Sequence, residues 1–418
     1  MQTTCGTVIH AEAELPRRVT MLFAVACGFS VANVYFAHPL LDVIAADFGL
    51  AASMAGGIIT ATQAGCALAL LLLVPLGDRV DRKRLTLTQV LLLSAALALV
   101  SVARTPGMLL AGMLATGMLG TAMTQGLIAY ASVVAPASRR GSVVGVAQGG
   151  VFVGLLLARV VSGAIADVSG WRSVYLVSAM TMLVLAAVLW WRLPVPEHQR
   201  STLSYPRLIA SMLSLLWHDR VLQIRGMLAL LMFAVFNIFW SALVFPLTAA
   251  PFGFSHSTVG AFGIVGAVGA FAAMRAGAWA DRGLPMAQCV TAVALVLLVL
   301  AWLPLSALHL SLWALVAGIL LLDIGGQAIH VTNQSLILRA KSDAAGRVIG
   351  AYMLFYSAGS GLGSLGATAA YAMGGWQAVC ALGASVSLLA LAVWRLTLRW
   401  MPAAAIQAAI TPRIRHQY

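Results

Sequence analysis

Two charged side chains fall near the middle of long uncharged segments of the sequence. Arg159 lies about 16 residues into one apolar segment, and Asp323 lies about 10 to 12 residues into another. On helices that rise ~1.5 Å per residue, both lie within about 10 Å of the middle of a membrane. An ionisable group at that depth costs several kcal/mol unless it is paired or wetted, so each residue requires a function or a partner.

Asp323 begins a polar stripe. Gln327, His330 and Gln334 follow it at i+4, i+7 and i+11, which keeps the four side chains within about 60° on one helix face. A carboxylate and an imidazole on one face form a path for protons. We predict that Asp323 binds a coupling proton and that His330 relays it or contacts a substrate. The alternative is that Asp323 is a permanent structural partner of Arg159 or of polar side chains and never titrates.

Arg159 also allows two interpretations. A guanidinium in a wet cavity can hold a carboxylate or phosphate with two hydrogen bonds, which predicts an anionic or hydroxylated substrate. Alternatively, Arg159 forms a charge pair with Asp323 or binds a network of acceptors.

Other polar residues within apolar segments are candidates for the wall of the same cavity. They are Asn33, Tyr35, His38, Thr121, Gln125, Asn237, Trp240, Gln327, Asn333 and Gln334. Tyr35 and His38 share a helix face, as a gate or a site wall would require. Each uncharged member of the set could instead bond a neighbouring helix.

The elements that must position these residues are membrane helices. Of the 418 residues, 61% are apolar and 9% are charged, whereas a soluble protein has roughly 25% charged residues. The mean hydropathy of +0.96 fits a body solvated by lipid. The composition excludes a soluble domain and indicates a polytopic membrane protein.

Charged residues are clustered and leave uncharged segments at 226–274, 283–322 and 348–394. Each is about twice the ~20 residues that one membrane helix needs, so each predicts a helical hairpin. Runs such as 68–74 do not alternate, which excludes a β-barrel. We predict an all-α membrane protein with twelve spans, near 18–41, 54–76, 85–103, 107–131, 143–166, 173–193, 226–249, 258–279, 287–308, 311–337, 348–370 and 377–399.

The distribution of the 25 Lys and Arg residues predicts the orientation. Basic residues in short loops stay on the cytoplasmic side, and 22 of them fall on one side if the N-terminus is inside. We therefore predict a bacterial inner-membrane protein with both termini in the cytoplasm. Because the charges are spread over many short loops, they do not indicate nucleic-acid binding. Residues 1–16 carry Glu12 and Glu14 and do not form a signal peptide.

The chain also repeats itself. Asp281-Arg282 follows Asp78-Arg79 after 203 residues, and Gly375-Trp376 follows Gly170-Trp171 after 205 residues. These spacings predict two similar six-helix halves. The expected parts are a cytoplasmic N-terminal tail (1–17), an N-terminal half (18–193), a linker (194–225), a C-terminal half (226–399) and a cytoplasmic C-terminal tail (400–418). A short surface helix is expected near 208–216.

The loop 78–83 resembles the signature loop of the major facilitator superfamily, and 277–283 resembles its second copy. Segments 33–41, 154–163 and 323–334 resemble a bacterial efflux subgroup that includes purine-ribonucleoside and arabinose or sugar exporters. The resemblance implies two halves that rock around a central site. It also implies that spans 1, 4, 7 and 10 line the cavity, which supports the substrate contacts named above.

In the signature loops, Asp78, Arg79, Arg82, Asp281 and Arg282 are predicted to form a cytoplasmic gate that latches the outward-open form. The alternative is a solvated loop that only sets topology. The pattern G-x-G-x-x-G at 361–366 follows no strand, so we interpret it as close helix packing and not as a dinucleotide site. Five cysteines occur singly and are interpreted as packing residues.

These features predict a secondary transporter that exports a small organic molecule in exchange for protons by alternating access. Import by proton symport or uniport is the alternative, and an intramembrane enzyme or sensor is a remote one. We expect no enzymatic activity, no metal and no cofactor, with the proton gradient as the energy source because no nucleotide-binding loop is present. The expected partners are the substrate and membrane lipid, with no nucleic acid, and the chain is expected to be a monomer.

Overall fold

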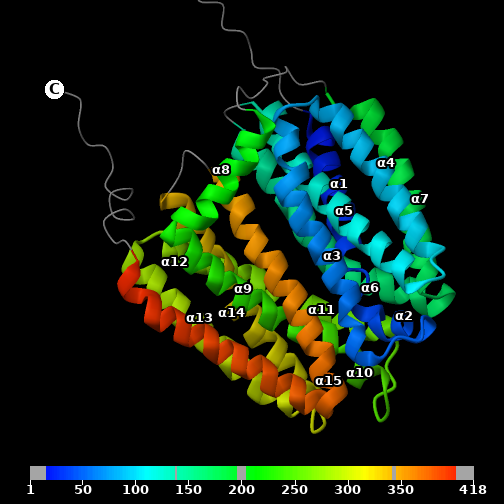
Figure 1. Ribbon diagram of the computed structural model, residues 1–418, viewed down its shortest axis with the longest axis vertical. Coiled ribbons are helices and arrows are strands. Elements are labelled where there is room, and N and C mark those ends of the chain that lie inside the picture. The colour runs from blue at the N-terminus through cyan, green and yellow to red at the C-terminus, as the bar shows by residue number, and fades with distance from the viewer. Residues whose placement is uncertain (1–15, 137–138, 195–203, 341–344, 402–418) are drawn as a thin grey trace, which may run out of the picture.

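The computed structural model describes residues 16–136, 139–194, 204–340 and 345–401. Within these ranges the chain is helical and contains no strand, as predicted. Most of the two predicted tails and residues 195–203 of the predicted linker lie outside the described residues. Figure 1 shows two helical bundles, one from the first part of the chain and one from the last.

Six membrane crossings make the first bundle, and six make the second. The first six are α1 (Arg17–Tyr35) continued by α2 (Leu41–Asp47), α3 (Gly56–Leu68) continued by the π-helical η3 (Ala69–Leu73), α4 (Arg82–Ser101), α5 (Pro106–Val134), α6 (Arg140–Ser169) and α7 (Trp171–Arg192). The last six are α9 (Arg220–Ala242) continued by α10 (Val244–Thr248), α11 (His256–Val265) with α12 (Val268–Ala280), α13 (Leu284–Ser306), α14 (Leu312–Ala340) and the two arms of α15 (Ala345–Thr397).

The twelve predicted spans are confirmed, but two of them differ from a simple helix. Ten helices in the described ranges are long and apolar enough to cross a membrane. One further crossing is split at Gly266 into α11 and α12, and α15 makes two crossings because it bends at Gly374 and Gly375. Gly375 has φ +61°, a left-handed conformation that glycine adopts without strain.

Local sequence signals begin several of these helices. Asp81 accepts a hydrogen bond from the Arg84 backbone N–H at 2.7 Å and so caps α4. Thr105 caps α5 in the same way, with Pro106 at the first helical position. Asp219 caps α9 by accepting from the Leu222 N–H.

The predicted surface helix is present as α8 (Tyr205–His218). Leu208 and Met212, one turn apart, are buried. The Tyr205 hydroxyl donates to the Leu72 carbonyl of the first bundle, and Arg347 of the second bundle donates to the Ser211 hydroxyl. We call the end of the molecule that carries α8 the linker end, and the opposite end, where α2 and α10 lie, the distal end.

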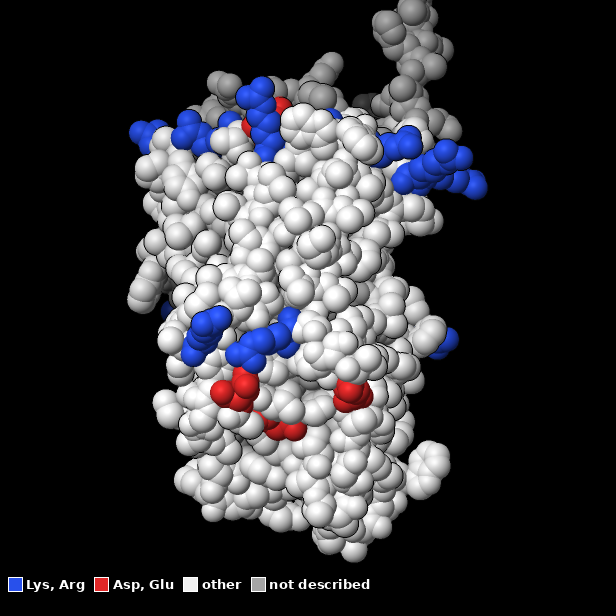
Figure 2. All heavy atoms as spheres, turned by 90° about the vertical axis from the view of Figure 1, so that its right-hand side faces the viewer, with Lys and Arg blue, Asp and Glu red and all other residues white. Residues whose placement is uncertain are grey.

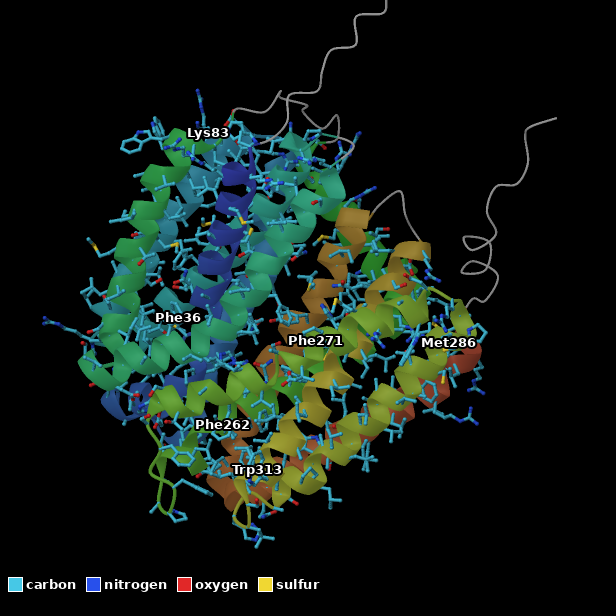
Figure 3. All side chains as sticks on the ribbon, turned by 180° about the vertical axis from the view of Figure 1, so that it is seen from behind. Phe36, Lys83, Phe262, Phe271, Met286 and Trp313 are labelled. Carbon is cyan, nitrogen blue, oxygen red and sulfur yellow. The ribbon has the colours of Figure 1, made fainter. Side chains whose placement is uncertain are left out.

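The outer surface has the character of a lipid-facing one. Phe271 is 66% exposed and Trp313 is 82% exposed, and both are labelled in Figure 3. The face in Figure 2 shows basic side chains gathered at the linker end and a mixed group of basic and acidic side chains farther down. A band without charged side chains separates them, as a membrane requires.

Helices cross most closely where one of them has a glycine. A Cβ atom on Gly150 of α6 would lie 2.0 Å from the Ala24 carbonyl oxygen of α1, and one on Gly117 of α5 would lie 2.0 Å from the Thr62 carbonyl oxygen of α3. Gly363, in the segment that matches G-x-G-x-x-G, packs in the same way against Ala234 of α9. The interpretation of that motif as helix packing is confirmed.

The two bundles meet at the distal end and spread apart toward the linker end, as Figures 1 and 3 show. At the distal end α6 crosses α11, where a Cβ on Gly163 would lie 2.3 Å from the His256 carbonyl oxygen. The Gly56 backbone N–H donates to the Thr368 hydroxyl, and the Thr60 hydroxyl donates to the Gly361 carbonyl, which joins α3 to α15.

A charged cluster adds to this contact. His256 of α11 lies between two carboxylates of the first bundle, with Nε2 3.1 Å from Asp42 and Nδ1 3.2 Å from Asp167. Carboxylates only accept, so both ring nitrogens can donate only when the imidazole carries two protons. Asp167 also accepts from the backbone N–H groups of His256 and Ser257, which are the first residues of α11. We call His256, Asp42 and Asp167 the distal latch.

Gly150→Ala should destabilise the protein by about 1 to 3 kcal/mol, because the methyl group has no room against α1. The measurement is the melting temperature of the purified protein in detergent. Gly149→Ala is the matched control, since a Cβ at Gly149 meets nothing within 4 Å. Equal melting temperatures for the two variants would contradict the close contact.

Asp42→Asn combined with Asp167→Asn should loosen the distal end, because each charge-assisted bond to His256 contributes about 1.5 to 3 kcal/mol. Double electron–electron resonance between spin labels at positions 51 and 310 should then show an additional population of molecules with a longer distance between the labels in detergent.

The control for this experiment is Asp47→Asn. It breaks the ion pair between Asp47 and Arg172, which lies at the same end but within the first bundle. An identical distance distribution in the double variant and the control would show that the latch does not hold the bundles together.

Candidate functional site

A cavity of about 440 Å³ lies between the two bundles, near the middle of the crossings. Eleven of the thirteen residues predicted for proton coupling or substrate contact line it. They are Tyr35, His38, Thr121, Gln125, Arg159, Asn237, Trp240, Asp323, Gln327, His330 and Gln334. Apolar and aromatic side chains complete the wall, so the cavity has the mixed character of a small-molecule site.

Arg159 of α6 enters the cavity wall at its distal side. It is 5% exposed, and its guanidinium carbon lies 3.9 Å from the centre of the Trp240 ring and 5.9 Å from that of Tyr35. Its Nε has no hydrogen-bond partner. Stacking on the rings therefore supplies part of the stabilisation that a carboxylate would otherwise give the guanidinium.

Asp323 of α14 lies on the same cavity and is also 5% exposed. Its Oδ2 has no hydrogen-bond partner. Among the described residues no ion pair within 4.0 Å joins Asp323 to Arg159. In this conformation the two charges share a cavity without pairing.

The turn between α11 and α12 makes room for both charges. A Cβ atom on Gly263 would lie 3.3 Å from Arg159 Cδ, and one on Gly266 would lie 2.6 Å from Asp323 Oδ2. Any larger residue at Gly266 would displace the carboxylate. The two charged side chains therefore pack against the point where this crossing breaks.

His330 contacts groups other than Asp323. Its Nδ1 lies 3.1 Å from the Tyr352 hydroxyl and its Nε2 lies 3.2 Å from the Gln334 amide nitrogen. Gln327 lies between His330 and Asp323 on the helix face, and all of them line the cavity. The polar stripe is therefore present, with His330 at the part nearer the linker end.

The distal side of the cavity is closed by two contacts between the bundles. The hydroxyls of Tyr35 and Tyr356 share a hydrogen bond, and His38 Nε2 lies 3.3 Å from Asn237 Oδ1. The Tyr35 and His38 rings are stacked on each other. We call these four residues the cavity floor.

Two predicted substrate contacts do not line the cavity. Asn33 is buried and accepts a hydrogen bond from the Ser178 hydroxyl of α7, because it lies on the face of α1 that turns away from the cavity. Asn333 is buried against α9, where it bonds the Arg225 backbone carbonyl. Each residue joins two helices within one bundle and does not line the cavity in this conformation, so its contact with substrate stays a prediction.

The position of Arg225 also differs from the prediction, in which this residue is the last of the linker. It lies inside α9 and is fully buried, with its guanidinium 3.2 Å from the Thr291 hydroxyl and 3.4 Å from Asn333 Oδ1. The helix begins at Arg220, six residues earlier than the apolar pattern indicates.

The cavity also has polar lining residues that the sequence analysis missed. Gln148, Tyr356 and Ser357 belong to this group. Gln148 precedes Arg159 by 11 residues, a spacing that returns to the same helix face, so the periodicity of α6 could have identified it. No local pattern in the sequence marks the bond between Tyr356 and Tyr35.

The described residues of the predicted gate lie at the linker end. Asp281 pairs with Arg339 of α14 at 2.5 Å and accepts from the Ser335 hydroxyl. Arg79 and Arg282 are exposed. Arg82 is the first residue of α4. The side chain of Asp78 lies outside what the structure describes.

Comparison with known proteins places this geometry in a family. Residues 21–364 match the model of the Major Facilitator Superfamily. Over 381 residues the chain is 40% identical to a protein named Uncharacterized transporter YgaY from Escherichia coli O157:H7, which covers 91% of this chain and 96% of that protein. It is also 32% identical to Probable transporter SCO4007 from Streptomyces coelicolor, over 86% of this chain and 83% of that protein.

The fold has solved counterparts. A bacterial homologue of the human lysosomal transporter Spinster, in an inward-facing and occupied conformation, superposes with a TM-score of 0.73 and 16% identity. The match covers 92% of this chain and 97% of that chain. Twelve crossings in two bundles, a central cavity and the family match agree, and the chain is a multi-pass membrane transporter that belongs to the Major Facilitator Superfamily.

Proposed function

We propose that this transporter is proton-coupled and exports a small organic molecule across the bacterial inner membrane by alternating access. The observation that carries the proposal is Asp323, a buried carboxyl group on the central cavity with one oxygen free of any partner. A buried carboxylate without a partner is costly, so binding a proton or a donor group there releases free energy. Such a group can couple the proton gradient to the substrate.

Orientation follows from charge. The linker end carries the basic residues around Arg79, Arg82, Lys83 and Arg84, and short basic loops stay in the cytoplasm. We therefore place the linker end and both termini in the cytoplasm. The bundles spread toward that end, and the cavity floor and the distal latch close the other, which supports an inward-facing state under this orientation.

The direction of transport rests on the resemblance of segments 33–41, 154–163 and 323–334 to bacterial exporters. In the proposed cycle, substrate enters from the cytoplasm while a proton leaves Asp323. The latch and floor then open, and a proton from outside displaces the substrate. The chain acts as a monomer, and the proton gradient supplies the energy.

A second candidate is import of an organic anion together with protons. The specific observation that favours it is Arg159, an unpaired buried cation on the same cavity. An anion held by Arg159 and a proton held by Asp323 would attract each other, and ligands that favour each other's binding move together.

Asp323→Asn should abolish the dependence of transport on a pH gradient, because the amide cannot bind the coupling proton. The measurement is growth of an efflux-deficient host on a panel of antibiotics, nucleosides, sugars, amino acids and organic acids, followed by transport of each hit in proteoliposomes with and without an imposed gradient.

The matched control is Asp47→Asn, which removes a carboxylate at the distal rim, outside the cavity. All three proteins must reach the membrane equally. Gradient-dependent transport that survives in Asp323→Asn would exclude this residue as the coupling site, and sensitisation of the host by the wild type would favour import over export.

A further inference from the structure

We propose that the substrate is a small zwitterion with an apolar side chain, such as an apolar amino acid or a short apolar peptide. Arg159 would hold its carboxylate and Asp323 its ammonium group. This inference rests on the proposed function, because it gives Asp323 both the coupling proton and the cationic end of the substrate.

Two buried polar atoms, one on each of the two charged residues of the cavity, have no hydrogen-bond partner. Arg159 Nε is a donor without an acceptor, and Asp323 Oδ2 is an acceptor without a donor. Both residues are 5% exposed and line the cavity. A monoanion would satisfy Arg159 alone, and a monocation would satisfy Asp323 alone. A ligand that carries both charges satisfies both side chains.

The spacing suits one small molecule. Arg159 approaches Gly263 and Asp323 approaches Gly266, and residues three apart on a helix lie about 5 to 6 Å from each other. In an α-amino acid the ammonium nitrogen lies roughly 2.5 Å from the carboxylate carbon. Two hydrogen bonds of about 2.8 Å extend that reach to roughly 8 Å. No ion pair within 4.0 Å joins the two described side chains, and a zwitterion of that reach can bond both of them.

Two contacts hold Arg159 in place. A Cβ atom on Gly260 would lie 2.2 Å from the Arg159 backbone carbonyl oxygen, so α6 and α11 are in tight contact at this point. Its guanidinium is stacked on Trp240 at 3.9 Å. The bidentate edge of the guanidinium remains available for a carboxylate.

The rest of the cavity fits an apolar side chain. Met232, Phe233 and Phe236 of α9 line one part of the wall, and Phe152 and Leu155 of α6 line another. A volume of about 440 Å³ accommodates a side chain of aromatic size beside the two charged groups. A strongly polar substrate group that lay against these five side chains would find no hydrogen-bond partner among them.

The charges that the substrate carries also determine whether it is exchanged for protons or transported together with them. The ammonium group of a zwitterion and a proton compete for the same carboxylate, so binding of one expels the other. That competition produces exchange of substrate for protons, as export requires. A plain carboxylate anion would instead strengthen proton binding at Asp323 and produce symport.

The test is binding of three matched probes to the purified protein in detergent. L-Phenylalanine carries both charges, 3-phenylpropionate lacks the ammonium group, and phenethylamine lacks the carboxylate. Isothermal titration should give at least tenfold weaker binding for each of the last two. In weakly buffered solution with a pH indicator, L-phenylalanine should release up to one proton per protein.

Two variants separate the roles of the charges. Arg159→Gln should weaken L-phenylalanine binding at least tenfold and leave phenethylamine binding within twofold. Asp323→Asn should abolish proton release and leave 3-phenylpropionate binding within twofold. The other side chains of titratable type on the cavity are Tyr35, His38, Cys66, His330 and Tyr356, and the loss of release in this variant assigns the proton to Asp323. Asp47→Asn controls for folding.

The outcomes distinguish this inference from the proposed function. Equal binding of 3-phenylpropionate with proton uptake would overturn the zwitterion and leave proton coupling intact. Failure of every natural amino acid and apolar dipeptide to bind would also overturn it. Proton release that persists unchanged in Asp323→Asn would overturn the proposed coupling site, whatever the substrate is.

Discussion

The cost of keeping charge inside a membrane governs the arrangement around the central cavity. Arg159 and Asp323 lie deep in a low-dielectric body, where an unpaired charge costs several kcal/mol. Stacking of Arg159 on Trp240 offsets only part of that cost, at about 0.5 to 2 kcal/mol. Two unpaired charges at this depth are a high-energy arrangement that a proton or a polar ligand relieves. A direct ion pair between Arg159 and Asp323 would also lower this cost, but the two charges would then not be available to bind a substrate.

Glycine makes this separation possible. Lipid offers no hydrophobic driving force between helices, so close packing depends on small residues. Within the bundles, Gly150 and Gly117 bring backbones into contact, and between them Gly163 does the same at the distal end. Gly263 and Gly266 have a different use, because the space they leave is filled by the charged side chains of other helices. Glycine thus allows close helix packing at some positions and leaves space for the charged side chains of the site at others.

The sequence allowed the crossings and most of the cavity to be predicted for physical reasons. Long uncharged segments have no stable alternative to spanning helices in lipid, and a charge inside them cannot be accidental, which identified Arg159 and Asp323. Single polar residues are less informative. Asn33 and Asn333 differ from Gln125 and Gln327 only in which face of a helix they occupy, and that phase depends on bends such as the 3₁₀ turn that follows α1.

Contacts between distant segments were beyond prediction. Gly266, where the crossing of α11 and α12 breaks, has no neighbouring proline to mark it. The partners of His256 come from positions 214 and 89 residues earlier in the chain, and the bond between Tyr35 and Tyr356 spans 321 residues. No local pattern encodes such pairings, because each depends on how the two bundles meet.

Tyr35 connects the site to the closure of the cavity. Its ring lies 5.9 Å from the Arg159 guanidinium, and its hydroxyl bonds Tyr356 across the bundles. In the proposed cycle, a ligand that bound Arg159 would therefore lie close to a residue of the floor itself. The floor consists of neutral hydrogen bonds worth about 0.5 to 1.5 kcal/mol each. Contacts of that size can be broken and remade in every cycle, so a ligand at the two charges can shift the balance between closed and open floors.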